Sequence, residues 1–430
     1  MSIKCLGYFI YLKTLGGSLK SRITIFLIVL FAFAELFAGG FQINEHGARA
    51  MGRGNAFTAV ANDPSAIYFN GAGLTQLRGT NFMLGTTVIA PAASFRGVAP
   101  EVTEYTLVAQ YFTPVHFFGS HSFSEDLAVG LGFTTPFGTG TKWGDDWVGR
   151  YLAIETELMT FTVSPVVAYN LLPNLAVSAG FVYSFANVTI IRKNSQAPFA
   201  GDALVELTGK ESAAFGYNFG VLYKPIPKLA FGASFHSEIA YTFEGTAKTT
   251  GPSQLAASLP NGDVKAELST PLNLAVGVAY DFTDDLNISA DFQYVGWSSY
   301  DTLKVDFVDP KYSDLAAPRE YKNSYILRLG GEYKFSKSLT ALAGIYFDKI
   351  PVDPEYLNPS LPDANRLGFT FGLDYKLTDN LGIGLSYLFI RASQLTVDNS
   401  KEFYTAGNAP FNGTYNSSAS LFAVSFSYSL

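Results

Sequence analysis

The chain has 430 residues, of which 48% are hydrophobic and 15% aromatic, and it carries 36 acidic side chains against 29 basic ones. That length would suit roughly two or three soluble domains. After the N-terminal region, no run of consecutive apolar residues reaches the ~18 that a membrane-spanning helix needs. The acidic balance argues against nucleic acid as a partner. Because Cys5 is the only cysteine, the sequence excludes disulfides and thiolate metal sites.

The first 38 residues have the pattern of a cleaved secretory signal peptide. Four basic residues precede the apolar run Ile23–Phe33, which is too short to span a membrane. Small residues allow cleavage after Ala34 or after Ala38. The mature protein is therefore expected outside the cytoplasm and without cysteine.

Residues 39–80 lack any sustained alternation of apolar and polar side chains. They are small and polar with scattered apolar residues, which indicates short helical turns and loops. We expect this segment to form a compact hatch, or plug, and residues 81–430 to form a separate barrel.

From residue 81 onward, apolar side chains alternate with small or polar ones, as in residues 381–389. This period of two predicts strands whose apolar face meets lipid and whose small face lines a lumen. The fold class expected is all-β, a fourteen-stranded antiparallel transmembrane β-barrel with the hatch in its lumen. The predicted strands are 81–94, 104–116, 126–135, 151–169, 174–192, 213–223, 229–243, 264–280, 286–297, 323–333, 339–349, 365–375, 381–397 and 414–430.

Six of these segments end on a tyrosine at or near a tight turn or the C-terminus, and longer connections alternate with the tight turns. A tyrosine ring prefers hydrocarbon while its hydroxyl prefers water, so the repeat predicts an interfacial girdle. Short periplasmic turns and long extracellular loops, here including 193–212 and 244–263, are typical of the bacterial outer membrane. The six tyrosines are Tyr169, Tyr223, Tyr280, Tyr333, Tyr375 and Tyr428.

Signals for catalysis are poor. The four histidines show no ligand spacing, and His116 and His121 fall in a predicted turn. Residues 138–144 superficially resemble a phosphate loop but lack its spacing and a following helix pattern. We therefore expect no catalytic residues, no metal and no cofactor.

Two basic residues lie at the extracellular ends of predicted strands, Arg192 and Lys322. A cation there could meet the carboxylate of an entering ligand, or it could be a rim charge solvated by water or paired with lipopolysaccharide.

Apolar clusters occur in two of the predicted loops. Leu204, Val205 and Leu207 lie in the first, and Leu255 and Leu259 in the second. They could form a landing groove for a hydrophobic ligand, or pack the loops into a cap.

Several separated motifs in the right order resemble the outer-membrane long-chain fatty-acid transporter family (FadL type), over essentially all of the mature chain. The strongest match is Phe347–Val352 followed by Leu361–Arg366. The other matching segments are Gly40–Glu45, Thr135–Trp143, Asp146–Tyr151, Gly296–Tyr300 and Arg328–Tyr333.

The resemblance implies a fourteen-stranded barrel with an N-terminal hatch and a two-stage route. Ligand would land in a groove between loops 193–212 and 244–263. It would then move to a lumenal site where Phe41 abuts it and Arg192 and Lys322 contact its carboxylate.

The resemblance also implies a kink in the third strand that opens the barrel wall, and Pro136 and Gly138 lie in the matching stretch. A proline there removes a ladder donor. The hatch motif Asn-Pro-Ala of the family reads Asn70, Gly71 and Ala72 here, so this turn is less rigid.

These patterns together predict a passive, monomeric outer-membrane transporter for hydrophobic small molecules. Long-chain fatty acids are the first expected substrate because two cations would pair with their carboxylate. Aromatic or alkane hydrocarbons are the second, and a general porin or a loop-mediated adhesin or phage receptor are the rival classes. The expected partners are outer-membrane lipid, lipopolysaccharide and the barrel-assembly machinery. Barrels of this kind more commonly end on an aromatic residue, so the final Leu430 would weaken recognition by that machinery.

Overall fold

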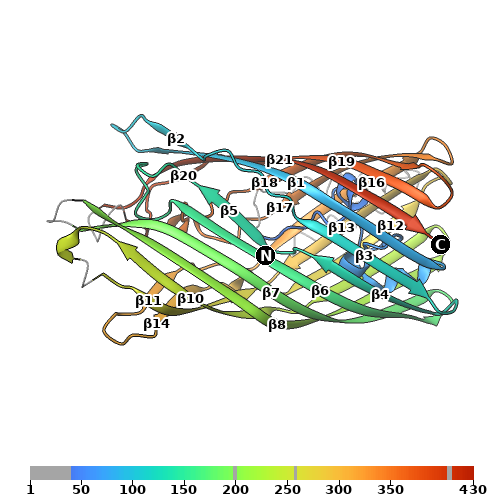
Figure 1. Cartoon of the computed structure of the whole chain (residues 1–430). Helices are drawn as coiled ribbons and strands as arrows, with labels where there is room; N and C mark the ends of the chain where they lie inside the picture. The colour runs from blue at the N-terminus through green and yellow to red at the C-terminus, as the bar shows by residue number, and fades with distance from the viewer. Residues whose placement is uncertain (1–39, 197–200, 256–258, 404–408) are drawn as a thin grey trace, which may run out of the picture. The chain divides into compact units, whose positions relative to one another are not determined.

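The computed structural model describes residues 40–196, 201–255, 259–403 and 409–430 (Figure 1). The predicted signal peptide lies outside the described residues. Among those described, no helix is both long enough and apolar enough to cross a membrane.

All strands belong to one antiparallel sheet. They are β1 (Thr80–Gly97), β2 (Glu104–Thr106), β3 (Val115–Ser122), β4 (Leu127–Thr134), β5 (Gly138–Lys142), β6 (Glu155–Leu172), β7 (Leu175–Ser195), β8 (Asp202–Ile226), β9 (Leu229–His236), β10 (Ile239–Thr250), β11 (Gly262–Thr270), β12 (Asn273–Asp281), β13 (Leu286–Val295), β14 (Thr302–Phe307), β15 (Leu315–Pro318), β16 (Ser324–Lys334), β17 (Leu339–Asp348), β18 (Arg366–Lys376), β19 (Leu381–Ala392), β20 (Leu395–Val397) and β21 (Gly413–Ser429).

These pieces make fourteen wall strands, as predicted, because several wall strands are interrupted. For example, β4 and β5 both pair with β6, and β9 and β10 both pair with β8. β21 pairs with β1 along almost its whole length, from Ser429 opposite Asn81 to Gly413 opposite Gly97. The sheet is therefore closed and leaves no unpaired edge between its first and last strands.

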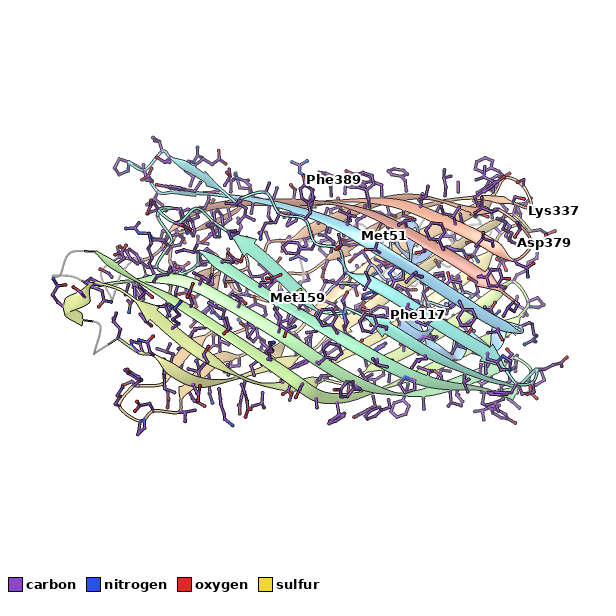
Figure 2. The ribbon with its side chains drawn as sticks, in the orientation of Figure 1. Met51, Phe117, Met159, Lys337, Asp379 and Phe389 are labelled. Carbon is purple, nitrogen blue, oxygen red and sulfur yellow. The ribbon has the colours of Figure 1, made fainter. Side chains whose placement is uncertain are left out.

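The alternation predicted from the sequence sets which side chains face lipid. On β7, Phe181 is exposed whereas Ser178 and Ser184 are buried. Outward side chains such as Phe117, Met159 and Phe389 lie along the wall in Figure 2. The six tyrosines of the predicted girdle are all between 38% and 46% exposed.

Two ends of the barrel can be distinguished. Lys337 and Asp379 belong to tight turns and lie at the same end as the C-terminus (Figures 1 and 2). We call this the turn end, and the opposite end, with the long hairpins, the loop end.

The structure corrects two expectations about connections. The predicted loop at 193–212 is largely strand and the one at 244–263 is strand at both of its ends, because β7, β8, β10 and β11 continue past the predicted boundaries. The two histidines placed in a turn lie on β3 instead. His116 bonds to the Ser425 hydroxyl at 3.1 Å and His121 to that of Thr80 at 2.8 Å.

The segment before β1, residues 40–79, is the hatch segment. It packs against the inner wall through buried polar contacts rather than through a sheet of its own. Glu332 on β16 lies 2.6 Å from the Arg49 guanidinium and 2.8 Å from that of Arg53. Asp291 on β13 accepts hydrogen bonds from the backbone N–H groups of Phe57 and Thr58. Its helices are α3 (Ala48–Gly52), α4 (Ala66–Phe69) and the 3-10 turn η1 (Gly71–Gln76).

Candidate functional site: two cavities separated by the N-terminal segment

An apolar cavity of about 190 Å³ lies inside the loop end, and we call it the loop-end cavity. Its apolar lining comes from six strands, β7, β8, β10, β11, β14 and β15. The lining includes Ile190, Leu207, Phe243, Val264, Val305 and Leu315. A hydrophobic chain entering here would exchange water for these side chains.

The first cluster of apolar residues that the sequence placed on a loop belongs to one of these strands, β8. Val205 and Leu207 are buried on β8 and pack with Val264 and Val305. Leu204 is only half-buried, since neighbouring residues on a strand face opposite sides. The first cluster therefore packs at the inner wall of the loop-end cavity and does not form an exposed groove.

The second predicted cluster is only partly described. Leu255 ends the short 3-10 turn η2 (Ser253–Leu255). Leu259 is buried, and its carbonyl accepts a hydrogen bond from the Tyr312 hydroxyl at 3.0 Å.

Three charged side chains meet in the loop-end cavity, Arg192, Arg319 and Glu402. The Arg319 guanidinium lies 3.3 Å from the Glu402 carboxylate. Arg192 makes no hydrogen bond or ion pair with any residue that the structure describes. Its guanidinium is therefore the cationic group in this cavity that is free to bind an anion.

Lys322 lies elsewhere. Its side chain is 65% exposed, pairs with Asp353 and does not line the loop-end cavity. The hydrogen bond that it donates to Asp353 raises the pKa of Lys322. The second cation beside Arg192 is Arg319, which sequence reasoning missed because the residues around it carry no strand or motif pattern.

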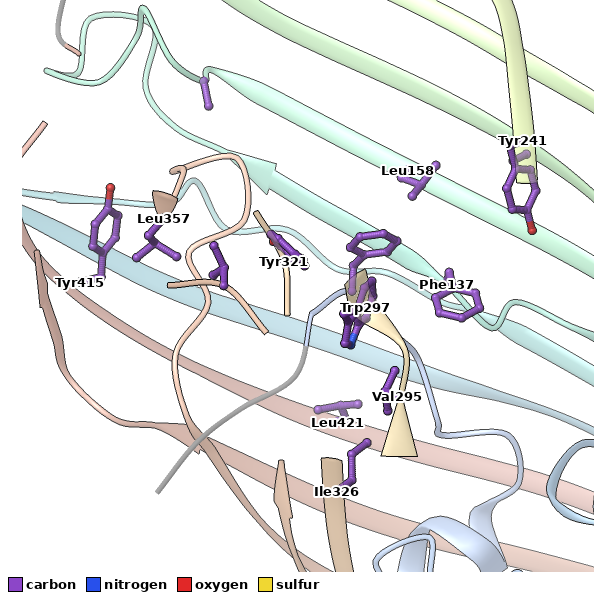
Figure 3. Close-up of a cluster of buried hydrophobic side chains, with 14 of the residues drawn as sticks. Phe137, Leu158, Tyr241, Val295, Trp297, Tyr321, Ile326, Leu357, Tyr415 and Leu421 are labelled. Atoms are coloured by element: carbon purple, nitrogen blue, oxygen red, sulfur yellow. The ribbon is translucent and has the colours of Figure 1, made fainter. Parts of the chain in front are cut away.

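Phe41 lies between the loop-end cavity and a second cavity, since it lines both. Its ring packs edge-on against Trp297, with centroids 4.7 Å apart, and against Phe137, at 6.2 Å. Figure 3 shows Trp297 and Phe137 in the cluster of buried hydrophobic side chains. The preceding Gly40 is clamped, because its N–H donates to Asp363 at 2.7 Å and its carbonyl accepts from Arg366 at 2.9 Å.

The N-terminal segment, residues 40–43, also pairs with the wall. Ile43 donates its N–H to the carbonyl of Pro136 at 2.9 Å, and Gly138 donates to the carbonyl of Phe41 at 3.0 Å. Gln42 and Phe137 are the paired residues between them. The segment thus acts as a short extra strand across the interval between β4 and β5.

That interval is an irregularity in the third wall strand. Thr134 pairs with Thr162 and Gly138 with Met159, so three residues here oppose two on β6. The Thr160 hydroxyl accepts a hydrogen bond from the N–H of Phe137 and donates one to its carbonyl, which also accepts from the Thr160 N–H at 3.1 Å. Such a bulge bends a strand and interrupts its pairing, and it lies in the stretch for which the resemblance implies a kink.

On its other side, the same strand has no neighbouring wall strand over this interval and pairs with the N-terminal segment instead. The ladder between β3 and β4 ends at Phe117 opposite Phe133. Farther along, Val108 donates to the carbonyl of Lys142 at 2.8 Å. The wall therefore lacks regular pairing between these two points.

A cavity of about 530 Å³ occupies this region, and we call it the wall cavity. Its lining includes the inward residues Glu45 and Arg366 and also outward ones. Among the outward ones, Tyr111 is 73% exposed and Met159 is 39% exposed. The wall cavity thus reaches both faces of the barrel. It shares Phe41, Thr139, Leu158 and Leu361 with the loop-end cavity, so these four residues lie between the two cavities.

The hatch motif lies against the wall away from these cavities. The Asn70 amide donates to the carbonyls of Thr58, at 2.8 Å, and Val221, at 2.9 Å, and its oxygen accepts from the N–H of Ala72. Gly71 approaches the wall closely, since a Cβ there would lie 2.7 Å from the Val166 side chain.

A closed β-barrel with a lipid-facing apolar surface, an internal hatch and an apolar cavity defines the class of plugged outer-membrane transport barrels. The family model described as outer membrane protein transport protein (OMPP1/FadL/TodX) matches residues 29–430, and the chain belongs to this family. It is thus a transport protein of the outer membrane for hydrophobic compounds, and not an enzyme.

The relatives differ in what they carry. The long-chain fatty acid transport protein of Salmonella typhi is 24% identical over 420 residues, covering 88% of this chain and 94% of that protein. The crystal structure of a Pseudomonas aeruginosa FadL homologue matches with a TM-score of 0.83 at 18% identity, over 91% of this chain and all (100%) of that one. The Pseudomonas putida toluene transporter TodX matches with a TM-score of 0.69 at 16% identity, over 92% of this chain and 99% of that one.

Proposed function

We propose that this protein carries long-chain fatty acids across the outer membrane, by capture in the loop-end cavity and exit through the wall cavity. The observation that carries the choice of substrate is the unpaired Arg192 guanidinium, which lies beside the Arg319–Glu402 pair in a mainly apolar cavity. A half-buried cation without a partner has lost part of its hydration, and a ligand carboxylate would supply a partner while the acyl chain covers the apolar lining.

Passage between the cavities requires the N-terminal segment to move. Phe41 closes the path, and its backbone is hydrogen-bonded to the third wall strand. Displacing the segment would join the loop-end cavity to the wall cavity and leave the bulge at Pro136 open toward lipid. The rest of the hatch segment, held by Glu332 and Asp291, would stay in place.

Uptake of neutral aromatic or alkane hydrocarbons is the second candidate, favoured by the apolar lining and by the pairing of Lys322 with Asp353. A neutral ligand would gain nothing from Arg192.

The test compares palmitate with the uncharged alcohol hexadecanol and with an aromatic hydrocarbon, on the purified barrel and its Arg192→Gln variant. We expect palmitate affinity to fall at least tenfold, since a hydrogen bond to a charged group contributes about 1.5–3 kcal/mol. Hexadecanol and the aromatic should bind as before.

Lys322→Gln is the matched control and should leave palmitate affinity unchanged. Palmitate binding that is weak throughout and indifferent to Arg192, with tight aromatic binding, would instead make the protein a hydrocarbon channel.

A further inference from the structure

In the described lining of the loop-end cavity, Glu402 is the one acidic side chain that forms an ion pair with an arginine. The other acidic residue of that lining, Glu267, makes no such pair among the described residues. The positive charge of Arg319 and the negative charge of Glu402 both act on Arg192. The three groups therefore form one electrostatic cluster at the place where a ligand carboxylate would bind.

The position of Glu402 is well fixed. Its Oε1 accepts hydrogen bonds from the Asn358 amide at 2.7 Å and from Arg319 at 3.3 Å. Its backbone N–H donates to the Ser400 hydroxyl at 3.1 Å, and its carbonyl accepts from the N–H of Phe411 at 2.7 Å. This carboxylate is thus held at the cavity from both its side chain and its backbone.

A carboxylate in this position resembles the headgroup of the proposed ligand. It already engages one of the two guanidinium groups of the cluster, so Arg319 is not free to bind a ligand carboxylate. A conduit must bind its cargo tightly enough to admit it but weakly enough to release it.

We infer that Glu402 is a built-in competitor for the ligand carboxylate, which occupies Arg319 and limits the affinity of the cavity for anionic ligands. The inference rests on the proposed capture of fatty acids at Arg192. Glu402 therefore sets how tightly fatty acids, but not neutral compounds, are held before they move on.

The test is Glu402→Gln, which keeps an oxygen for Asn358 and Arg319 but removes the charge. We expect palmitate to bind about tenfold more tightly and hexadecanol to bind as in the unmodified protein. Glu355→Gln is the matched control, because it removes a nearby acidic charge that does not line the cavity. That control should change neither affinity.

The Arg319→Gln background separates competition for Arg319 from simple repulsion. If Glu402 acts by occupying Arg319, its replacement should bring no gain once Arg319 is gone. A gain that persists there, or equal gains for palmitate and hexadecanol, would overturn the inference.

Failure of the inference is distinct from failure of the proposed function. Palmitate affinity that depends on Arg192 but is unchanged by Glu402→Gln would remove the competitor and leave fatty-acid capture intact. Palmitate affinity that is indifferent to both residues would overturn both. Unchanged hexadecanol binding in each variant verifies that the cavity is still formed.

Discussion

The backbone N–H of Gly138 donates a hydrogen bond to the carbonyl of Phe41, at 3.0 Å. One partner belongs to the barrel wall at its bulge, and the other forms the partition between the two cavities. Because they share a hydrogen bond, the partition cannot leave its place without changing the pairing of the wall. In the proposed route, capture and exit are therefore linked through the backbone.

Replacing Phe41 with alanine should weaken binding of every hydrophobic ligand. The ring lines both cavities and packs on Phe137, Trp297 and Tyr300. Losing this apolar surface should lower affinity for palmitate and hexadecanol alike by about tenfold, or ~1.4 kcal/mol. Equilibrium binding measures both. A loss confined to palmitate would contradict the apolar role and assign the effect to the carboxylate.

Gly71→Ala should destabilise the barrel by about 1–3 kcal/mol, because the added methyl would overlap Val166 at 2.7 Å and Ser178 at 2.8 Å. Gly144→Ala is the matched control, since nothing lies within 4 Å of its Cβ position. The stability of each variant is measured as the temperature at which the fast-migrating folded barrel disappears from a detergent gel. Equal midpoints for the two variants would show that the hatch does not approach the wall as described.

Glu332→Gln should cost about 3–5 kcal/mol, because it leaves the guanidinium groups of the buried Arg53 and the half-buried Arg49 without their shared carboxylate. The exposed pair of Glu244 with Lys265 offers a control, and Glu244→Gln should leave the unfolding midpoint unchanged because water screens the pair. Urea unfolding in lipid vesicles compares the two variants. A small effect at Glu332 would mean that the hatch is held by other contacts.

The barrel could be predicted from the sequence because lipid imposes a simple rule on each strand. Outward positions must be apolar, so the period of two counts the wall strands directly, and the tyrosines mark the turn end. The rule no longer applies to the parts of the strands beyond the membrane, where outward positions need not be apolar. Between Ser184 and Ala186 the register of β7 with β8 shifts, and beyond the shift Leu207 faces inward. Alternation alone therefore could not tell an extended wall from an apolar loop.

The charged cluster of the loop-end cavity was harder to predict. Arg192 follows from its place at the end of a strand, but Arg319 and Glu402 come from irregular segments far apart in the sequence. Only packing in three dimensions brings them together, and it leaves Lys322 paired with Asp353 instead. No spacing or composition signal marks such a cluster.

The central claim is that ligand leaves the loop-end cavity only when the N-terminal segment moves away from the third wall strand. Gln42 and Phe137 are directly opposed, and the hydrogen bonds on either side make them a non-hydrogen-bonded pair. In such a pair the Cα atoms lie about 4.5 Å apart, within the range that a disulfide needs. The sequence has no other cysteine beyond Cys5 in the predicted signal peptide, so a Gln42→Cys/Phe137→Cys pair would form one defined link.

The most direct measurement is palmitate uptake by cells whose only such transporter carries this pair, before and after reduction, with each single cysteine variant as control. Our account predicts that the oxidised pair binds palmitate but does not transport it, and that reduction restores uptake. Normal uptake by a fully cross-linked protein would contradict the account, since the ligand would then pass without any movement of the N-terminal segment.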